Sequence, residues 1–150
     1  MAQSLSKVYT HIIFSTKNRK DLIDDHIEPM LFSYIGGICK RLECYPLQVG
    51  GHRDHVHILC LLSKKIAQMK LLEVVKKQSS KWIKTKGPQY LDFYWQDGYG
   101  IFSVDPLEIE LVKEYIKFQE NHHKTTNFQD EFRSFLKRYK VEYDERYVWD

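Results

Sequence analysis

The sequence predicts a single α+β domain, residues 1–150, in which helices cover an antiparallel sheet. Its length of 150 residues suits one compact domain and leaves no room for two ordinary ones. Hydrophobic residues make up 43% and charged residues 29%, so a packed core is expected and disorder throughout is excluded. Segments with alternating and with helical apolar spacing follow one another in the order strand, helix, strand, strand, helix, strand.

The first half of the chain is expected to form three strands and one helix. Residues 8–15 alternate with period 2 and predict the first strand. Apolar residues at helical spacing predict a helix over 25–42. A strand over 45–49 and a turn over 50–54 follow. Residues 55–62 are nearly all apolar and predict a central strand.

The second half begins with a lysine-rich amphipathic helix over 66–84, which Gly87 and Pro88 end. The aromatic segment 93–96 and the segment 101–104 then form either a hairpin or a last strand with a bulge.

Residues 105–123 are expected to form a helix with a well-marked start, because Asp105 can cap it and Glu108 can complete a capping box. A last amphipathic helix is expected over 130–139. The aromatic and acidic tail, 141–150, is expected to pack as an irregular strap.

This order of elements is the ferredoxin-like, or split βαβ, plan. We therefore expect a four- to five-stranded antiparallel sheet with two helices on one face and extra carboxy-terminal helices. The other face of the sheet is free for a partner, a substrate or a further helix.

The composition favours a cytoplasmic protein. The longest apolar stretch, 58–62, is too short to span a bilayer, and the first seven residues lack the plan of a signal peptide. The three cysteines, Cys39, Cys44 and Cys60, form no CxxC pair, which excludes a disulfide scaffold and a zinc finger.

Positive charge is concentrated in one window of the chain. Eight lysines lie within residues 64–86, against one acid, Glu73, while the whole chain carries only +3. Such a stripe is typical of a protein with a polyanionic partner, but a solvated helix face explains it equally well.

Two histidines stand on an otherwise apolar strand. His55 and His57 flank Val56, so both side chains point to the same face of the sheet, roughly 6.6 Å apart along the strand. They can converge on one metal ion, since buried imidazoles need partners for their nitrogens. Two hydrogen-bonded histidines in a sheet are the alternative.

A tyrosine and a glutamine share one face of the helix over 105–123. Tyr115 and Gln119 are four residues apart, although a tyrosine in the core and a glutamine in water would give the same pattern. His122 and His123 are interpreted as a pair at the helix end, although His122 on the Tyr115 face could reach the metal region. Asp54 is interpreted as a turn residue, although it could orient His55.

Taken together, these features resemble the HUH endonucleases, in which a hydrophobic residue separates two histidines. More narrowly, the chain resembles the one-tyrosine transposases of small insertion sequences that move as single-stranded DNA, including the REP-associated tyrosine transposases. Four blocks carry the resemblance: residues 9–17, 50–59, 95–104 and 115–123.

The resemblance implies a site and a reaction. His55, His57 and Gln119 would hold a divalent metal ion, Mg²⁺ or Mn²⁺, and Tyr115 would be the nucleophile. Tyr115 would attack a phosphodiester, form a 5′-phosphotyrosine and release a 3′-hydroxyl. The covalent link conserves the bond energy, so rejoining needs no nucleotide cofactor. Imidazole ligands favour Mn²⁺ over Mg²⁺.

The resemblance also implies partners and a setting. Family members act as homodimers on single-stranded DNA with hairpins, in the bacterial cytoplasm and without a membrane. Basic residues on the stripe and outside it are expected to contact phosphates: Lys17, Arg19, Arg53, Lys76, Lys77, Lys81 and Lys84.

Two other functions remain open from the sequence. The chain could be a domesticated endonuclease that cuts single-stranded DNA hairpins without moving an element. It could also be a non-catalytic nucleic-acid-binding module on the same fold, with structural histidines. A histidine-triad hydrolase is excluded because position 59 is Leu59.

Overall fold

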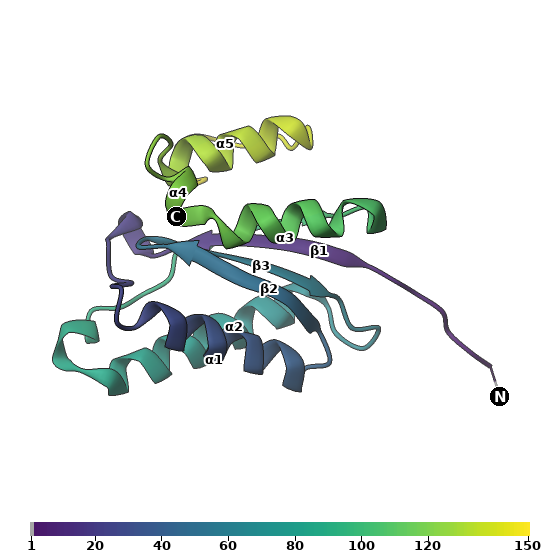
Figure 1. Ribbon diagram of the computed structural model, residues 1–150, viewed down its shortest axis with the longest axis horizontal. Coiled ribbons are helices and arrows are strands. Elements are labelled where there is room, and N and C mark those ends of the chain that lie inside the picture. The colour runs from purple at the N-terminus through teal and green to yellow at the C-terminus, as the bar shows by residue number, and fades with distance from the viewer. Residues whose placement is uncertain (1) are drawn as a thin grey trace.

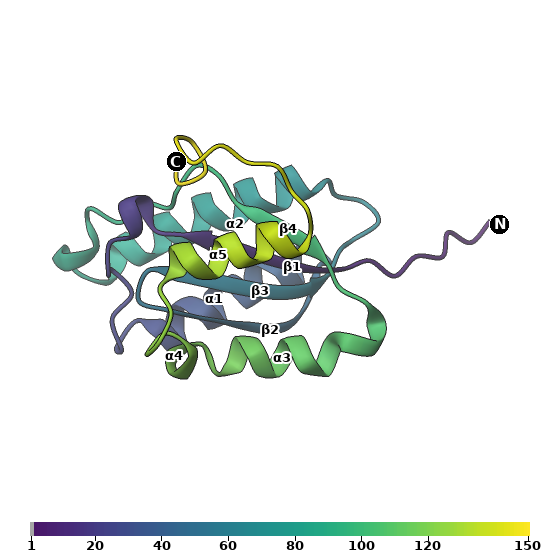
Figure 2. The same cartoon turned by 90° about the horizontal axis from the view of Figure 1, so that it is seen from above.

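The computed structural model describes residues 2–150 and contains one sheet between two layers of helices (Figure 1). Helices α1 and α2 cover one face, and α3, α4 and α5 cover the other, as the view from above also shows (Figure 2). The elements are β1 (Tyr9–Ser15), η1 (Lys17–Arg19), α1 (Glu28–Arg41), β2 (Tyr45–His52), β3 (His55–Leu61), α2 (Gln68–Ile83), η2 (Lys84–Lys86), η3 (Pro88–Tyr90), β4 (Gly100–Ser103), η4 (Pro106–Glu108), α3 (Ile109–Lys117), α4 (Gln119–His122) and α5 (Phe128–Arg138).

The four strands lie in the order β2-β3-β1-β4, and each neighbouring pair is antiparallel. Helices α1 and α2 make the two crossovers, so the ferredoxin-like plan is confirmed. The central pair, β1 and β3, sets Ile13 opposite His57 and Ser15 opposite His55. The histidine pair therefore lies on a central strand, at one end of the sheet.

The segment 93–96 forms no regular strand and no hairpin with β4, so the hairpin is wrong. It instead continues the pairing of β4 alongside β1 beyond an interruption at 97–99, as expected of a last strand with a bulge. It is tied down by side chains: Phe93 and Trp95 are buried, and the Trp95 indole donates to Ser79 Oγ. Its backbone also pairs with the end of β1: Thr16 bridges to Trp95, the Lys17 N–H donates to the Tyr94 carbonyl, and the Gln96 N–H donates to the Ser15 carbonyl. Strand β2 is longer than predicted and continues through both glycines to His52.

The long helix expected over 105–123 is broken. The Asp105 carboxylate caps its start by accepting the Leu107 N–H at 2.8 Å, as predicted, but Glu108 makes no capping bond within residues 2–150. The chain leaves helical geometry at Phe118, with φ −103° and ψ 29°, and α4 restarts at Gln119. Helix α5 begins earlier than predicted because Asn127 caps it through the Asp130 N–H.

Strand alternation separates the core from the face that bears the histidines. In β3, Val56, Ile58 and Cys60 point toward α1 and α2 and belong to the largest hydrophobic cluster. The alternate residues His55 and His57 point toward α3–α5 and are 0% exposed. In residues 2–150, no helix combines the length and apolar character that crossing a bilayer requires.

Two glycines let the upper helices approach the sheet closely. A Cβ at Gly50 in β2 would lie 2.7 Å from the Ile116 carbonyl oxygen of α3. A Cβ at Gly100 in β4 would lie 2.6 Å from the Phe132 ring of α5. These missing side chains fix how deeply the two helices sit on the strands.

Replacing Gly50 by alanine is expected to lower the free energy of unfolding by about 1–3 kcal/mol, because the methyl group overlaps backbone atoms of α3. Gly37→Ala is the matched control. Gly37 lies in α1 with nothing near its missing Cβ, so alanine should raise stability by about 0.5–1 kcal/mol. Urea unfolding followed by tryptophan fluorescence checks both. Equal midpoints for the two variants would contradict the close contact between α3 and β2.

Candidate active site

Residues from four elements meet between the sheet and the carboxy-terminal helices. His55 and His57 come from β3, Tyr115 from α3, Gln119 from α4 and Glu131 from α5. Of these five, only Tyr115 is not fully buried. The four residues that the sequence predicted as nucleophile and metal ligands therefore lie together, and Glu131 joins them.

Glu131 is the centre of this cluster. Its Oε1 lies 3.0 Å from His57 Nε2 and 3.5 Å from His55 Nε2, while its Oε2 lies 3.3 Å from His123 Nε2. The Tyr115 hydroxyl donates a hydrogen bond to Glu131 Oε2. One carboxylate thus contacts both the histidines and the tyrosine.

Burial by itself raises the pKa of Glu131, but the surrounding imidazoles and their hydrogen bonds hold that pKa far below its usual range. Glu131 is therefore ionised at neutral pH. Burial raises the pKa of the Tyr115 phenol, and the neighbouring Glu131 charge raises it further. The tyrosine hydroxyl is accordingly protonated and serves as a hydrogen-bond donor.

His55 is held by hydrogen bonds on both sides of its ring. Its Nδ1 lies 2.7 Å from Asp54 Oδ1, so Nδ1 carries the proton and Asp54 accepts it. The opposite nitrogen, Nε2, then presents a lone pair to Gln119 Oε1 at 2.9 Å. Two acceptors face each other in this arrangement, which suits a cation bound between them.

His57 is oriented by a second histidine from β1. His57 Nδ1 and His11 Nε2 are 2.8 Å apart, which leaves His57 Nε2 directed at Glu131. Burial lowers the pKa of both His57 and His11, so both rings are neutral and able to act as ligands. The position of His11 beside the site agrees with the pairing of β1 with β3.

Gln119 and His123 complete the cluster. The Gln119 Oε1 atom is 2.9 Å from the Nε2 atoms of both His55 and His123. The interpretation of His123 as a helix-end residue is thus incomplete, because its ring turns inward against Glu131. Burial lowers the pKa of His123, but the hydrogen bond and the charge of Glu131, with smaller contributions from its other neighbours, together raise it above its usual value.

The donor atoms fit a divalent metal ion. Nitrogens of His55, His57 and His123 and an oxygen of Glu131 all lie within 4.8 Å of one another. Ligand atoms bound to one ion at about 2.1 Å are separated by roughly 3.0–3.4 Å, close to the distances around Glu131. Three imidazoles with carboxylate and amide oxygens are a set that Mn²⁺ accepts more readily than Mg²⁺.

The sequence reasoning missed Glu131, although a signal was present. Glu131 is the one acid on the apolar side of α5, between Phe128, Phe132 and Phe135 at helical spacing. An acid at such a position must be buried with partners or must leave the interface. The pattern of α5 therefore identifies Glu131 as a candidate site residue.

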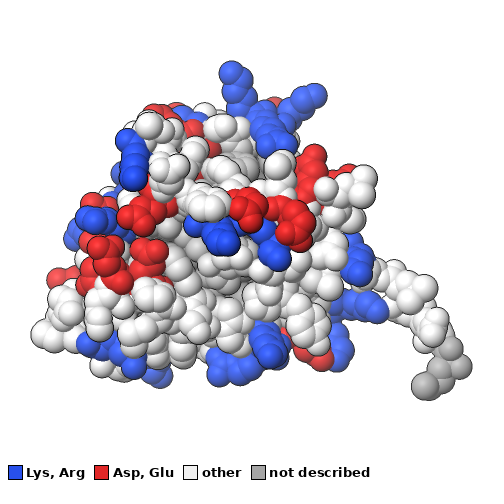
Figure 3. All heavy atoms as spheres, in the orientation of Figure 1, with Lys and Arg blue, Asp and Glu red and all other residues white. Residues whose placement is uncertain are grey.

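The seven predicted phosphate contacts do not lie together. Lys76, Lys77 and Lys81 stand on α2, and Lys84 follows it, on the face of the sheet opposite the cluster (Figure 1). Lys17, Arg19 and Arg53 lie at the end of the sheet next to the site, where Thr16 N donates to Asp54 O. Figure 3 shows mostly basic side chains along the lower edge, while basic and acidic groups mix across the middle.

Two of these lysines are engaged within the protein. Lys84 lies over the Tyr94 ring at 4.1 Å, and the Tyr94 carbonyl accepts the Lys17 N–H. Lys76 donates to the carbonyls of residues 96, 97 and 98 at 2.6–3.0 Å. Burial lowers the pKa of Lys76 to about 8, whereas three carbonyl acceptors favour its charged form.

Comparison with known proteins agrees with this architecture. The family model described as Transposase IS200 like matches residues 4–119. A candidate transposase from Deinococcus radiodurans R1 has a similar crystal structure, with 19% identity, a TM-score of 0.62 and coverage of 79% of this chain and 98% of that one. A REP-associated tyrosine transposase bound to a REP hairpin is similar at 14% identity and a TM-score of 0.57, over 82% and 74% of the two chains. No curated protein sequence matches the chain.

Replacing Lys76 by methionine is expected to lower the free energy of unfolding by about 1–3 kcal/mol, because three carbonyls lose their donor. The exposed neighbour Lys77 provides the control, and Lys77→Met should change stability by less than about 0.5 kcal/mol. Urea unfolding of both variants measures the difference. Equal stabilities would show that the Lys76 contacts contribute nothing.

Mn²⁺ is expected to raise the melting temperature of the protein by about 5–10 °C at a concentration near 100 times its Kd. Glu131→Gln keeps the shape of the side chain but removes the charge, so this shift should largely disappear. The exposed His26 supplies a control, because His26→Gln should keep the full shift. An equal rise in the melting temperature of Glu131→Gln would show that Glu131 is not a metal ligand.

Proposed function

Because the chain belongs to the IS200-like transposase family, we propose that it is a metal-dependent transposase acting on single-stranded DNA. It cleaves and rejoins the strand at hairpin-bearing ends of a mobile element, through a 5′-phosphotyrosine at Tyr115. It works in the bacterial cytoplasm and needs no nucleotide cofactor, because the covalent link keeps the energy of the phosphodiester.

One observation carries this proposal: the Tyr115 hydroxyl and the histidines of β3 contact the same buried carboxylate, Glu131. A nucleophile and a metal site must adjoin for tyrosine to attack a phosphate that a metal ion polarises. A structural histidine pair has no need of a tyrosine beside it. This contact therefore favours the enzyme over a non-catalytic binding module.

His55, His57 and Gln119 are the proposed metal ligands, with Glu131 and His123 in position to join them. A bound divalent ion would polarise the scissile phosphate and offset the charge that develops on its oxygens. Asp54 and His11 fix the ring orientations of the two β3 histidines through their Nδ1 atoms.

Tyr115 carries the covalent step in this proposal. Its phenol gives up its proton and its oxygen forms a bond to phosphorus, while the bond from phosphorus to the 3′-oxygen breaks. The 3′-oxygen takes up a proton and leaves as a 3′-hydroxyl. Glu131 accepts the hydrogen bond of the phenol and so holds its oxygen beside the metal ligands. A second 3′-hydroxyl reverses the reaction and seals the strand.

Hairpin DNA and a homodimer complete the proposal. A structural neighbour with the same fold is a REP-associated tyrosine transposase bound to a REP hairpin, which supports a hairpin substrate here. Tyr115 contacts Glu131 of its own chain, which supports an active site built within each protomer of the dimer. Lys17, Arg19 and Arg53 at the sheet end are the nearest proposed phosphate contacts.

Incubation with labelled single strands from the DNA that flanks the gene, with Mn²⁺ or Mg²⁺, is expected to give a covalent adduct on a denaturing gel. Tyr115→Phe should abolish the adduct, because the attacking oxygen is lost, and so should EDTA and His57→Ala. Tyr143→Phe, in the exposed tail, should leave it unchanged.

An adduct that persists in Tyr115→Phe would assign the nucleophile elsewhere. Binding of the strands without any adduct, at both ends and with both metals, would favour a non-catalytic binding module. Specific cleavage of hairpin strands without any joined product would instead favour the domesticated endonuclease.

A further inference from the structure

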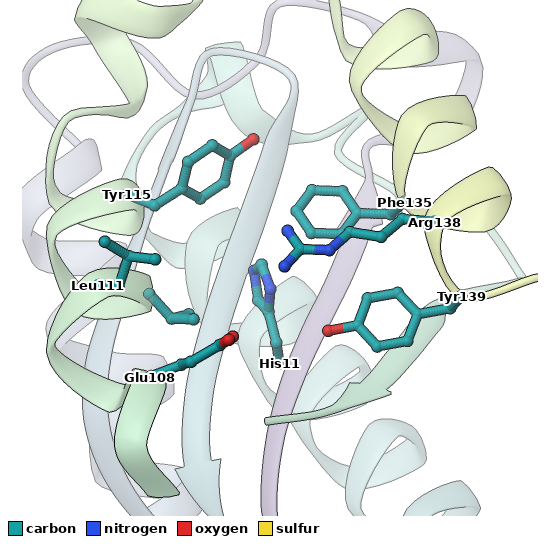
Figure 4. Close-up of a pocket in the computed structure, with 8 residues that line it drawn as sticks. His11, Glu108, Leu111, Tyr115, Phe135, Arg138 and Tyr139 are labelled. Carbon is teal, nitrogen blue, oxygen red and sulfur yellow. The ribbon is translucent and has the colours of Figure 1, made fainter. Parts of the chain in front are cut away.

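A pocket of about 150 Å³ opens beside Tyr115, on the side away from the metal ligands. It lies over β1 between α3 and α5, and Figure 4 shows the side chains that surround it. Those that matter here are His11, Glu108, Tyr115, Phe135, Arg138 and Tyr139. The volume suits one planar ring system and is too small for a base pair.

Polar groups point into this pocket without partners from the protein. Within residues 2–150, no hydrogen bond or ion pair engages the Arg138 guanidinium or the Glu108 carboxylate, and both point inward in Figure 4. His11 is 2% exposed, and its Nε2 is taken up by His57.

The aromatic wall of the pocket is rigid. Phe135 packs edge-on against His11 at 5.1 Å, and Tyr139 stacks on Phe102 at 4.7 Å between ring centroids. The Tyr139 hydroxyl donates to the Ser103 carbonyl at 3.1 Å, which anchors the ring to β4. Fixed aromatic rings beside an open slot are the usual platform for an unpaired base.

We propose that this pocket binds one unpaired guanine of the DNA strand, next to the phosphate that Tyr115 attacks. The inference rests on the proposed function and names a base-specific subsite of the same enzyme. Tyr115 forms one wall of the pocket. A base attached near the phosphate that Tyr115 attacks can therefore enter the pocket.

Guanine fits the charges of the pocket better than the other bases. Its N1–H and exocyclic amino group can donate to the Glu108 carboxylate, while O6 and N7 accept from the Arg138 guanidinium. Thymine offers no amino group to the carboxylate, adenine carries an amino group in place of O6, and cytosine has no N7. A phosphate is disfavoured by the Glu108 charge.

The subsite is tested by a binding titration, whose result does not depend on DNA cleavage. Tyr115→Phe protein is titrated by fluorescence anisotropy with labelled thymidine strands that carry one guanine, one inosine or one 7-deazaguanine. Inosine lacks only the amino group that Glu108 would accept, and 7-deazaguanine lacks only the N7 that Arg138 would reach. Guanine is expected to bind about tenfold more tightly than either analogue.

Second substitutions assign each contact. Glu108→Gln should remove the preference for guanine over inosine, and Arg138→Ala the preference over 7-deazaguanine. Glu110→Gln, two residues after Glu108, and Lys137→Ala, next to Arg138 in α5, change exposed residues and should keep both preferences. Equal affinity for all three strands, or preferences unchanged in both pocket variants, would overturn the subsite. A covalent adduct without base preference would overturn the subsite alone, whereas base preference without an adduct would overturn only the proposed chemistry.

Discussion

The buried carboxylate of Glu131 is the constraint on which the rest of the upper layer depends. A charge in that position is tolerated only if hydrogen-bond donors or a cation surround it. His57, His123 and Tyr115 supply those donors from a strand, a helix end and a second helix. The carboxylate therefore joins α3 and α5 to the sheet more specifically than the small apolar clusters beneath those helices do.

The two faces of the sheet have different roles, since one packs against the large core and the other bears the histidine cluster. Alternation along β3 sends Val56 and Ile58 into the large core under α1 and α2, and sends His55 and His57 to the opposite side. Gly50 and Gly100 have no side chains on that side, which allows α3 and α5 to pack closely against the strands. A one-residue shift in register would exchange the two roles, which makes the register of the central strands essential.

The fold could be predicted from the sequence because the strands and helices follow clear apolar periodicities. The spacing of His55 and His57 was enough to predict that they share one face of the sheet. At 93–96 the sequence left a hairpin and a bulged last strand open, and it failed at Phe118, where the helix breaks. It also failed at Glu131. That residue comes from a helix beyond residues 4–119, the region that the family match covers, and only tertiary packing brings it to the histidines.

The order of these parts along the chain has a consequence for synthesis on the ribosome. The split βαβ unit ends with β4 at Ser103, so the sheet with its histidine pair can fold before the remaining helices emerge. Tyr115, Gln119 and Glu131 all belong to elements that are made after this unit. A nascent chain that has reached only β4 thus carries the β3 imidazoles without the Tyr115 hydroxyl or the Glu131 carboxylate, and the cluster is complete only after α5 has been made.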